Sequence, residues 1–172
     1  GGWAGGNVDV GHKQLTVKFR AGGAFAGVDM PFCSGGGKVS REHAPRAAAA
    51  GAVVIDNTSE FRYQDDIPLV VSEVNPEAIA GYKRHGIIAN PNCSTMQMLV
   101  ALAPIHLASG IERINVATSQ SVSGSGRTWL EELCRQPAAL VPFQPLQAGR
   151  VSTQLAFNVI HPYPLFPDNG FS

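Results

Sequence analysis

The sequence predicts an α/β fold in which a parallel sheet is wound with crossover helices. Three short apolar segments without polar alternation predict buried strands, at Val28–Cys33, Ala52–Asp56 and Ile87–Ala89. Helical patterns lie between them, from Ser40 to Gly51 and over Pro76–Arg84. Buried strands that alternate with helices are typical of parallel sheets, because the crossover helices cover the faces of the sheet.

The N-terminal segment carries weaker signals. The opening GGWAGGNVDVGH is rich in glycine without a period and predicts a loop, whereas Lys13–Phe19 alternates like a short strand. The first helix has a candidate N-cap at Ser40. Because Pro45 is tolerated only near the start of a helix, we expect this helix to begin at Ser40 or at Ala44.

Later segments continue the pattern of short strands and helices. The sequence predicts, in order, a strand at Leu69–Ser72, a helix over Ser94–Ala108 that stops at Gly110, a strand at Arg113–Thr118, a helix over Thr128–Leu140 that Thr128 caps, and a strand-like run at Gln154–Ile160. Proline is frequent after Val141, so that part of the chain carries few further elements.

The composition excludes several classes of protein. Lysine plus arginine equals aspartate plus glutamate, so the charge predicts no nucleic-acid or anionic-membrane partner. The longest apolar runs, Ala47–Ile55 and Met96–Ile105, are too short to span a bilayer, and no secretory leader pattern opens the chain. The three cysteines are widely spaced and no metal-ligand motif occurs. We therefore expect a cytoplasmic protein without a disulfide framework or a metal site.

Three features follow the predicted strands and point to one edge of the sheet. They are the glycine loop Ser34–Gly37, the turn Asn57–Ser59 and the segment Asn90–Cys93. Ligands of open parallel sheets bind beyond the carboxyl ends of the strands. The residues Ser34, Gly35 and Gly36 let a backbone approach a cofactor closely, although they do not form G-x-G-x-x-G and a plain turn is the alternative.

Cys93 lies where the sequence predicts the start of a helix, in NPNCST. Free N–H groups and the dipole at a helix start stabilise a thiolate, which attacks carbonyl carbons to form a thioacyl intermediate. The alternative is a cysteine that merely fills a helix start. A thiol hydrolase that uses His106 is disfavoured, because 13 residues at about 1.5 Å each separate the two residues by about 20 Å along one helix. We expect Cys33 and Cys134 to be structural.

Two further polar residues are candidate ligand contacts. Arg62 follows a strand-end loop in SEFR and is suited to binding a phosphate or a carboxylate. Gln120 follows a predicted strand and precedes a serine-glycine loop. Solvated surface side chains are the alternative for both residues.

Several segments together resemble one family, the bacterial aspartate-semialdehyde dehydrogenases. These segments are DNTS with FR, IPLVVSEVNPEAI, GIIANPNCSTMQMLVALAPIH and GIERINVATSQSVSGSG. The resemblance runs almost without gaps from about Phe25 to Leu133 and then thins. NPNCST is specific, since neither the N-acetyl-glutamyl-phosphate reductase pattern nor the C-T-T-N of glyceraldehyde-3-phosphate dehydrogenases fits.

The resemblance implies an NADP-dependent reductive dephosphorylation of aspartyl-4-phosphate to aspartate-4-semialdehyde, which leads toward lysine, threonine, methionine and isoleucine. Cys93 matches the family's nucleophile, Gln120 and Arg62 match contacts to the substrate and its phosphate, and Asn92 neighbours the phosphate site. The residues that match cofactor contacts are Ser34, Gly35, Gly36, Asn57, Ser123 and Gly124. A homodimer is implied, with a partial Rossmann-like NADP-binding domain at 1–92 and the beginning of an α+β catalytic and dimerisation domain at 93–172.

The sequence also departs from the family pattern. No strand with a pyrophosphate-binding glycine turn opens the chain, and nothing matches the later segment that supplies a histidine acid–base and a second substrate arginine. Ser119 stands where a tyrosine is usual. We therefore expect a partial or degenerate family chain that is inactive by itself, and a non-catalytic remnant that keeps only binding and dimerisation surfaces is the alternative function.

Overall fold

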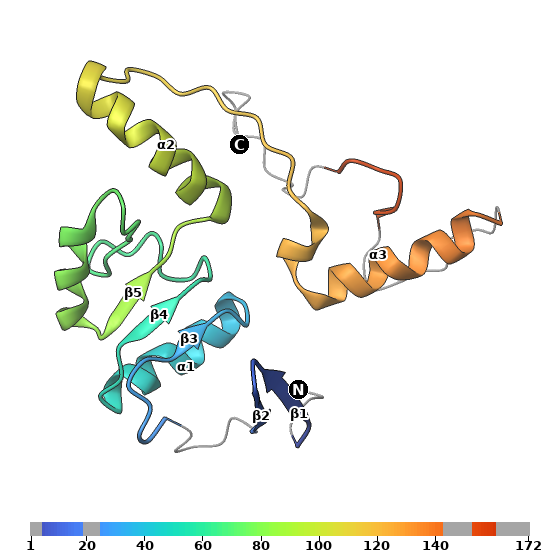
Figure 1. The fold of residues 1–172 in the computed structure, drawn as a ribbon, viewed down its shortest axis with the longest axis horizontal. Helices are drawn as coiled ribbons and strands as arrows, with labels where there is room; N and C mark the ends of the chain where they lie inside the picture. The colour runs from blue at the N-terminus through green and yellow to red at the C-terminus, as the bar shows by residue number, and fades with distance from the viewer. Residues whose placement is uncertain (1–4, 19–24, 143–152, 161–172) are drawn as a thin grey trace. The chain divides into compact units, whose positions relative to one another are not determined.

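The computed structural model describes residues 5–18, 25–142 and 153–160 (Figure 1). The chain divides into two compact units, Gly1–Ile114 and Asn115–Ser172, and each unit is described by itself. None of the helices within the described ranges is both long and apolar enough to cross a membrane.

A three-stranded parallel sheet forms the centre of the first unit. Its order is β3 (Phe32–Cys33), β4 (Val54–Asp56) and β5 (Ile87–Ala89), and Leu69 adds an isolated parallel bridge to Ala89. Branched apolar residues dominate the strands and are favoured on a pleated, buried surface. The predicted parallel sheet is confirmed, although the strand predicted at Leu69–Ser72 is reduced to this one bridge.

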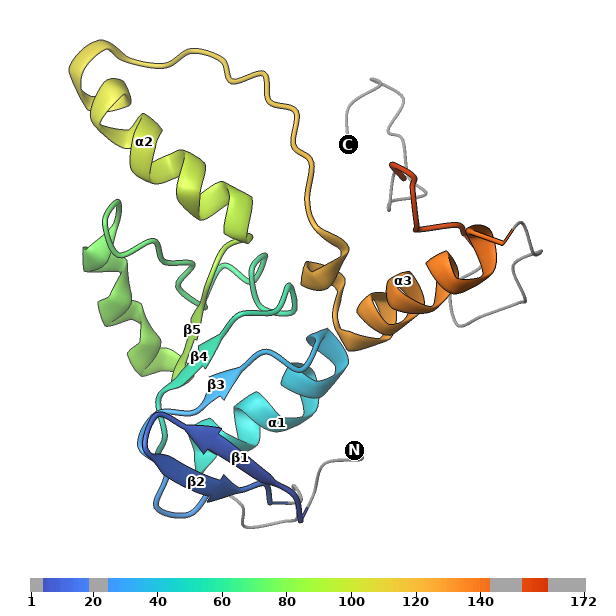
Figure 2. The same ribbon diagram turned by 45° about the vertical axis from the view of Figure 1, so that its right-hand side comes forward.

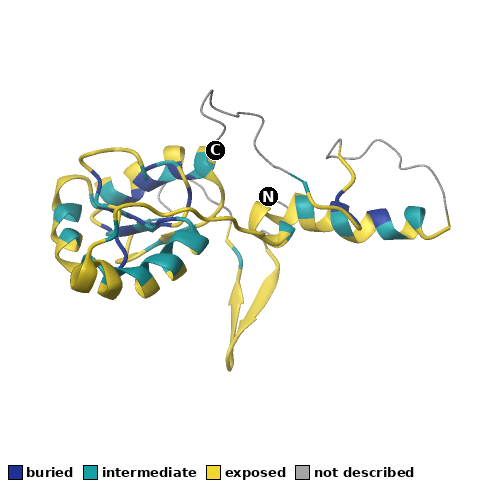
Figure 3. Ribbon diagram, turned by 90° about the horizontal axis from the view of Figure 1, so that it is seen from above, coloured by how far each residue is buried: buried dark blue, intermediate teal, exposed yellow. Residues whose placement is uncertain are grey.

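The helix α1 (Gly37–Ala49) covers one face of the sheet (Figure 2). Its Ala44 and Ala47 are fully buried against Val54 and Ile87, because small side chains let the helix approach the strands closely. Figure 3 shows that the buried residues of this unit gather around the sheet.

The predicted start of α1 at Ser40 or Ala44 is wrong, because α1 begins at Gly37 with Gly36 as its N-cap. Pro45 therefore lies inside the helix. Proline cannot donate to the carbonyl four residues before it, which here belongs to Arg41. Both Arg41 and Pro45 are exposed, so water can satisfy this carbonyl at little cost.

The next helices follow local sequence signals. The 3-10 helix η1 (Pro76–Arg84) has proline at its first position, where the missing N–H has no helical partner to lose. The helix α2 (Cys93–Ser109) ends at Gly110, whose φ of 73° suits a glycine. The predicted bounds of β5 and η1 are confirmed, and those of α2 differ by one residue at each end.

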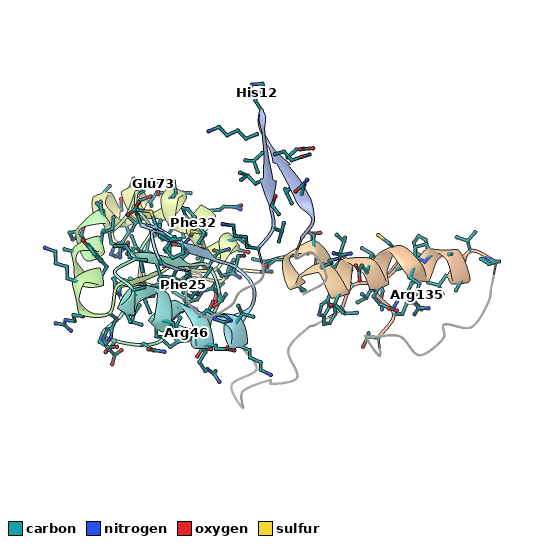
Figure 4. All side chains as sticks on the ribbon, turned by 90° about the horizontal axis from the view of Figure 1, so that it is seen from below. His12, Phe25, Phe32, Arg46, Glu73 and Arg135 are labelled. Carbon is teal, nitrogen blue, oxygen red and sulfur yellow. The ribbon has the colours of Figure 1, made fainter. Side chains whose placement is uncertain are left out.

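The opening segment is not the predicted loop. Asn7–Val10 (β1) pairs with Lys13–Thr16 (β2) in an antiparallel hairpin, with His12 at its tip (Figure 4). The side chains of Asn7 and Asp9 each bond to Gln14 on one face. Cross-strand side-chain pairs stabilise such hairpins, and here they join residues seven and five positions apart.

The second unit contains η2 (Val122–Ser125), α3 (Arg127–Leu140) and the segment 153–160. The predicted helix at Thr128–Leu140 is confirmed, but its N-cap is Gly126 rather than Thr128. The strands predicted at Arg113–Thr118 and Gln154–Ile160 are wrong, because both segments are irregular. No strand pairs with either within the residues that the structure describes, and an unpaired strand is not stable in water.

Two glycines with positive φ provide a matched test of the contact between α1 and the sheet. At Gly51 (φ +95°) a Cβ would meet nothing within 4 Å, whereas at Gly86 (φ +67°) it would lie 2.8 Å from the Ala48 Cβ. We expect Gly51→Ala to cost about 1 kcal/mol through backbone strain, and Gly86→Ala about 3 kcal/mol because the overlap adds to that strain. Urea unfolding of both variants measures the difference, and equal costs would contradict the close packing at Gly86.

Candidate functional site

The three features expected at one sheet edge lie together at the carboxyl ends of neighbouring strands. Ser34 follows β3, Asn57 follows β4 and Asn90 follows β5. The Asn57 N–H donates to the Cys33 carbonyl, and the Asn90 N–H donates to the Asp56 carbonyl, each at 2.8 Å. The ladder thus continues past the strands and fixes the start of each loop.

Arg62 bridges the ends of β4 and β5. Its Nε donates to the Asn90 carbonyl at 2.8 Å, and its Nη2 donates to the Asn57 carbonyl at 3.2 Å. A guanidinium has five N–H donors. Three of them make no hydrogen bond to the part of the chain that the structure describes, so Arg62 is held in place and keeps donors for a ligand.

Asp56, the last residue of β4, orders the turn at this sheet edge. It was not among the predicted site residues. Its carboxylate is fully buried, and its Oδ1 accepts from the Thr58 N–H at 2.8 Å and from the Thr58 hydroxyl at 2.6 Å. This turn directs the Asn57 carbonyl toward Arg62. An aspartate that ends a strand two residues before a threonine is the sequence signal for such a turn.

Cys93 is the first residue of α2, as the sequence predicts. The Asn92 side chain caps the helix, since its Oδ1 accepts from the Ser94 N–H at 3.0 Å. The Cys93 thiol is exposed, with its Sγ 3.9 Å from the same Oδ1. Backbone N–H groups of a first helical turn stabilise negative charge on a thiolate or on an oxyanion beside it.

His106 lies in the last turn of the same continuous helix. Its Nδ1 accepts from the Ile111 N–H at 3.0 Å, so the imidazole pairs a backbone donor just past the C-terminus of α2. Because Cys93 and His106 lie at opposite ends of one helix, they form no catalytic dyad.

The glycine loop fits a cofactor that approaches the backbone. Ser34, Gly35 and Gly36 are exposed, and Gly36 is the N-cap of α1 with a φ of 92° and without a side-chain cap. A Cβ at Gly36 would meet nothing within 4 Å among the described atoms. The backbone at Gly36 is therefore open to close approach, as it is in anion-binding loops of parallel sheets.

The remaining predicted contacts belong to the second unit. Gln120 is exposed in an irregular segment. Ser123 lies in η2, where its hydroxyl donates to the Ser121 hydroxyl at 3.0 Å, and the Gly124 N–H donates to the Ser121 carbonyl at 3.2 Å. The candidate residues thus form one group around Arg62 and Cys93 in the first unit and a separate serine-glycine turn in the second. The roles of Gln120, Ser123 and Gly124 stay predictions.

The other two cysteines differ in their surroundings. Cys33 packs against the core cluster, whereas Cys134 is exposed on α3. Across the described ranges, no group of three or more histidine, cysteine, aspartate and glutamate side chains is arranged to hold a metal ion.

Comparison with known proteins relates this geometry to one family. The family model for the semialdehyde dehydrogenase NAD binding domain matches residues 4–82, and the model for the semialdehyde dehydrogenase dimerisation domain matches residues 102–170. The chain belongs to the semialdehyde dehydrogenase family. An NAD-binding α/β domain followed by the start of a dimerisation domain is the predicted fold class, which is therefore confirmed.

Curated semialdehyde dehydrogenases with similar sequences carry a more specific name. The chain is 51% identical to the aspartate-semialdehyde dehydrogenase of Shewanella sp. (strain DB6705) over 98% of its own length and 50% of the relative's. It is 57% identical to aspartate-semialdehyde dehydrogenase 2 of Vibrio cholerae over 84% of its own length and 43% of the relative's. The chain spans about half the length of these relatives.

A solved structure of the same family matches most of the fold. Aspartate semialdehyde dehydrogenase II from Vibrio cholerae, complexed with ASA, superposes with a TM-score of 0.89 at 50% identity. The match covers 99% of this chain and 51% of that one. The predicted resemblance to aspartate-semialdehyde dehydrogenases is confirmed.

Proposed function

We propose that this chain serves the NADP-dependent reductive dephosphorylation of aspartyl-4-phosphate to aspartate-4-semialdehyde. The observation that carries the proposal is the pairing of an exposed thiol at the start of α2 with an arginine that Asn90 and Asn57 hold at the same sheet edge. The names of the relatives and the ASA complex of the Vibrio cholerae enzyme support it. The product leads toward lysine, threonine, methionine and isoleucine.

In the first step, the Cys93 thiolate attacks the acyl carbon of aspartyl-4-phosphate. The C–S bond forms and the C–O bond to phosphate breaks, so that phosphate leaves with the bonding electron pair. Arg62 binds this phosphate through the donors that the backbone carbonyls leave unused. Asn92 supports the step by holding the helix start beside the thiol.

When bound, the cofactor supplies the hydride that reduces the thioester. The resulting thiohemiacetal carries an oxyanion on the former carbonyl oxygen, and the positive end of the α2 dipole would stabilise this charge. Collapse of this oxyanion breaks the C–S bond and returns the thiolate of Cys93. We assign the cofactor contacts to Ser34, Gly35, Gly36 and Asn57.

We further propose that Gln120 contacts the substrate and that Ser123 and Gly124 contact the cofactor. These residues belong to the second unit, where Ser121 orders the turn. The change from the cofactor-binding domain (1–92) to the catalytic and dimerisation domain (93–172) then falls at the nucleophile. The proposed assembly is a homodimer in the cytoplasm, and the match to a dimerisation domain supports the dimer.

Alkylation of the folded chain tests the assignment of the nucleophile. We expect iodoacetamide to label Cys93 faster than Cys33 and faster than the exposed Cys134, because the start of α2 stabilises the thiolate. Peptide mass spectrometry after short exposures measures the three rates. Faster labelling of Cys33 or Cys134 would remove Cys93 as the nucleophile, and phosphate-dependent reduction of NADP with aspartate semialdehyde tests turnover by this chain.

A further inference from the structure

The loop that carries Arg62 is tied to α1 by a bidentate ion pair. The Arg41 Nε donates to Glu60 Oε1 at 2.6 Å, and the Arg41 Nη2 donates to Glu60 Oε2 at 2.9 Å. Arg41 lies near the start of α1, and Glu60 lies two residues before Arg62. Two parallel hydrogen bonds fix the orientation of both groups as well as their distance.

The pair also touches the end of the glycine loop. A Cβ at Gly37 would lie 3.2 Å from Glu60 Oε2, closer than side chains normally approach. Gly37 has no positive φ, so its lack of a side chain serves this contact rather than a backbone conformation. The Glu60 carboxylate therefore lies directly against the segment that leads from the candidate cofactor loop into α1.

On its other side, Glu60 is joined to Arg62 by a short and well-held segment. The Glu60 N–H donates to the Thr58 hydroxyl at 3.3 Å, and that hydroxyl donates to the buried Asp56. Phe61, between Glu60 and Arg62, is 5% exposed and belongs to the core cluster. Because both flanks of Glu60 are held, a displacement of its carboxylate acts on Arg62 rather than being absorbed by a flexible loop.

The charge state of the pair suits this role near neutral pH. The hydrogen bonds from Arg41 lower the pKa of Glu60 below its usual value, despite partial burial, and raise that of Arg41. A carboxylate with a lowered pKa contributes stability above its unfolded pKa and loses it as the pH falls through the folded pKa. The pair therefore remains charged through the neutral range and weakens only in acid.

We propose that Arg41 and Glu60 are positioning residues that couple cofactor binding at the glycine loop to phosphate binding at Arg62. This inference rests on the proposed function, because it takes the cofactor loop and the phosphate site as assigned there. A cofactor that orders Gly36 and Gly37 holds Glu60 in place, and Glu60 holds the Arg62 loop in its binding geometry. Coupling of binding free energies is reciprocal. Phosphate must therefore raise the affinity for the cofactor by the same factor by which the cofactor raises the affinity for phosphate.

Titration calorimetry of the 172-residue chain with NADP⁺ and inorganic phosphate tests the coupling. We expect each ligand to bind about fivefold more tightly when the other is saturating, at the low end of usual couplings because the Arg41 side chain is 74% exposed. Glu60→Gln is expected to abolish the dependence of one ligand on the other. The affinity for each ligand alone should change less than about twofold.

Two controls separate positioning from general damage. Glu42→Gln removes the partner of Arg46 on the same helix, 4.0 Å away and outside the Arg62 loop, and should leave the coupling intact. The charge exchange Arg41→Glu with Glu60→Arg should restore part of the coupling, which a merely structural loss would not allow. If NADP⁺ or phosphate fails to bind the unaltered chain, the proposed function fails and this inference falls with it. If both bind without coupling, or the coupling survives Glu60→Gln, the inference alone is overturned.

Discussion

Replacing Cys93 with serine is expected to lower the rate of covalent acylation by aspartyl-4-phosphate by at least about 10³-fold. A serine hydroxyl remains protonated at neutral pH and needs a base, whereas a helix start can stabilise a thiolate without one. The nearest histidine along α2 is His106, which lies at the opposite end of the helix and accepts from the Ile111 N–H. His106 is therefore not available to activate the hydroxyl.

Intact-mass spectrometry after mixing with aspartyl-4-phosphate measures the covalent adduct. Cys134→Ser is the matched control, because it makes the same chemical change at another exposed cysteine. The control should acylate at the unaltered rate. An adduct that persists in Cys93→Ser, or that disappears in Cys134→Ser, would place the nucleophile elsewhere. The first turn of α2 already holds a serine at Ser94, so a serine at position 93 should leave the helix intact. Circular dichroism checks this.

Elements that depend on local signals could be predicted from the sequence. Ile87–Ala89 is a short branched run, and Pro76 and Gly110 punctuate the chain where helices begin and end. The position of Cys93 followed in the same way, because the apolar run of the predicted helix begins directly after it. Each of these predictions needed only a few neighbouring residues.

Features that depend on distant partners could not be predicted. The hairpin of β1 was missed for a different reason, because its bonds to Gln14 are local but the glycine-rich composition does not reveal them. Arg62 was expected to be a ligand contact, but its anchors are backbone carbonyls, and one lies 28 residues away. The bond of Glu60 to Arg41 spans 19 residues. Every residue has a backbone carbonyl, so the sequence does not show which carbonyl accepts a hydrogen bond. It therefore indicates Arg62 as a candidate but not the groups that hold it.

Gln136 in the second unit is the extreme case of such a hidden feature. Its side chain is 2% exposed and makes four hydrogen bonds, and it directly follows Arg135, which Figure 4 labels on α3. Its Oε1 accepts from the Leu155 N–H at 2.6 Å and the Ala156 N–H at 3.0 Å. Its Nε2 donates to the Thr153 carbonyl at 3.3 Å and to Glu132 Oε1 at 3.1 Å. The Gln136 amide thus pairs the backbone of residues 153–156, which no strand pairs with among the described residues.

We expect Gln136→Ala to destabilise the packing of residues 153–156 on α3 by about 3 kcal/mol. The substitution leaves two buried N–H groups without an acceptor, and each such loss costs about 1–3 kcal/mol. It also removes a donor from Glu132, which is 5% exposed and accepts two further hydrogen bonds from Arg135, at 2.6 Å and 3.3 Å. Amide hydrogen exchange at Leu155 and Ala156 measures the loss directly.

The controls use the division of the chain into two compact units. Glu131→Gln removes an exposed pair with Arg127 on the same helix, and we expect it to cost less than about 0.5 kcal/mol. Exchange at β4 and β5 should be unchanged in both variants, since Gln136 contacts only its own unit through these bonds. If Gln136→Ala leaves Leu155 and Ala156 protected, then apolar burial of those residues, which are 6% and 2% exposed, holds the segment instead. The sequence does not reveal the role of Gln136, because a buried glutamine on an amphipathic helix cannot be told from a solvated one until its hydrogen-bond partners are known.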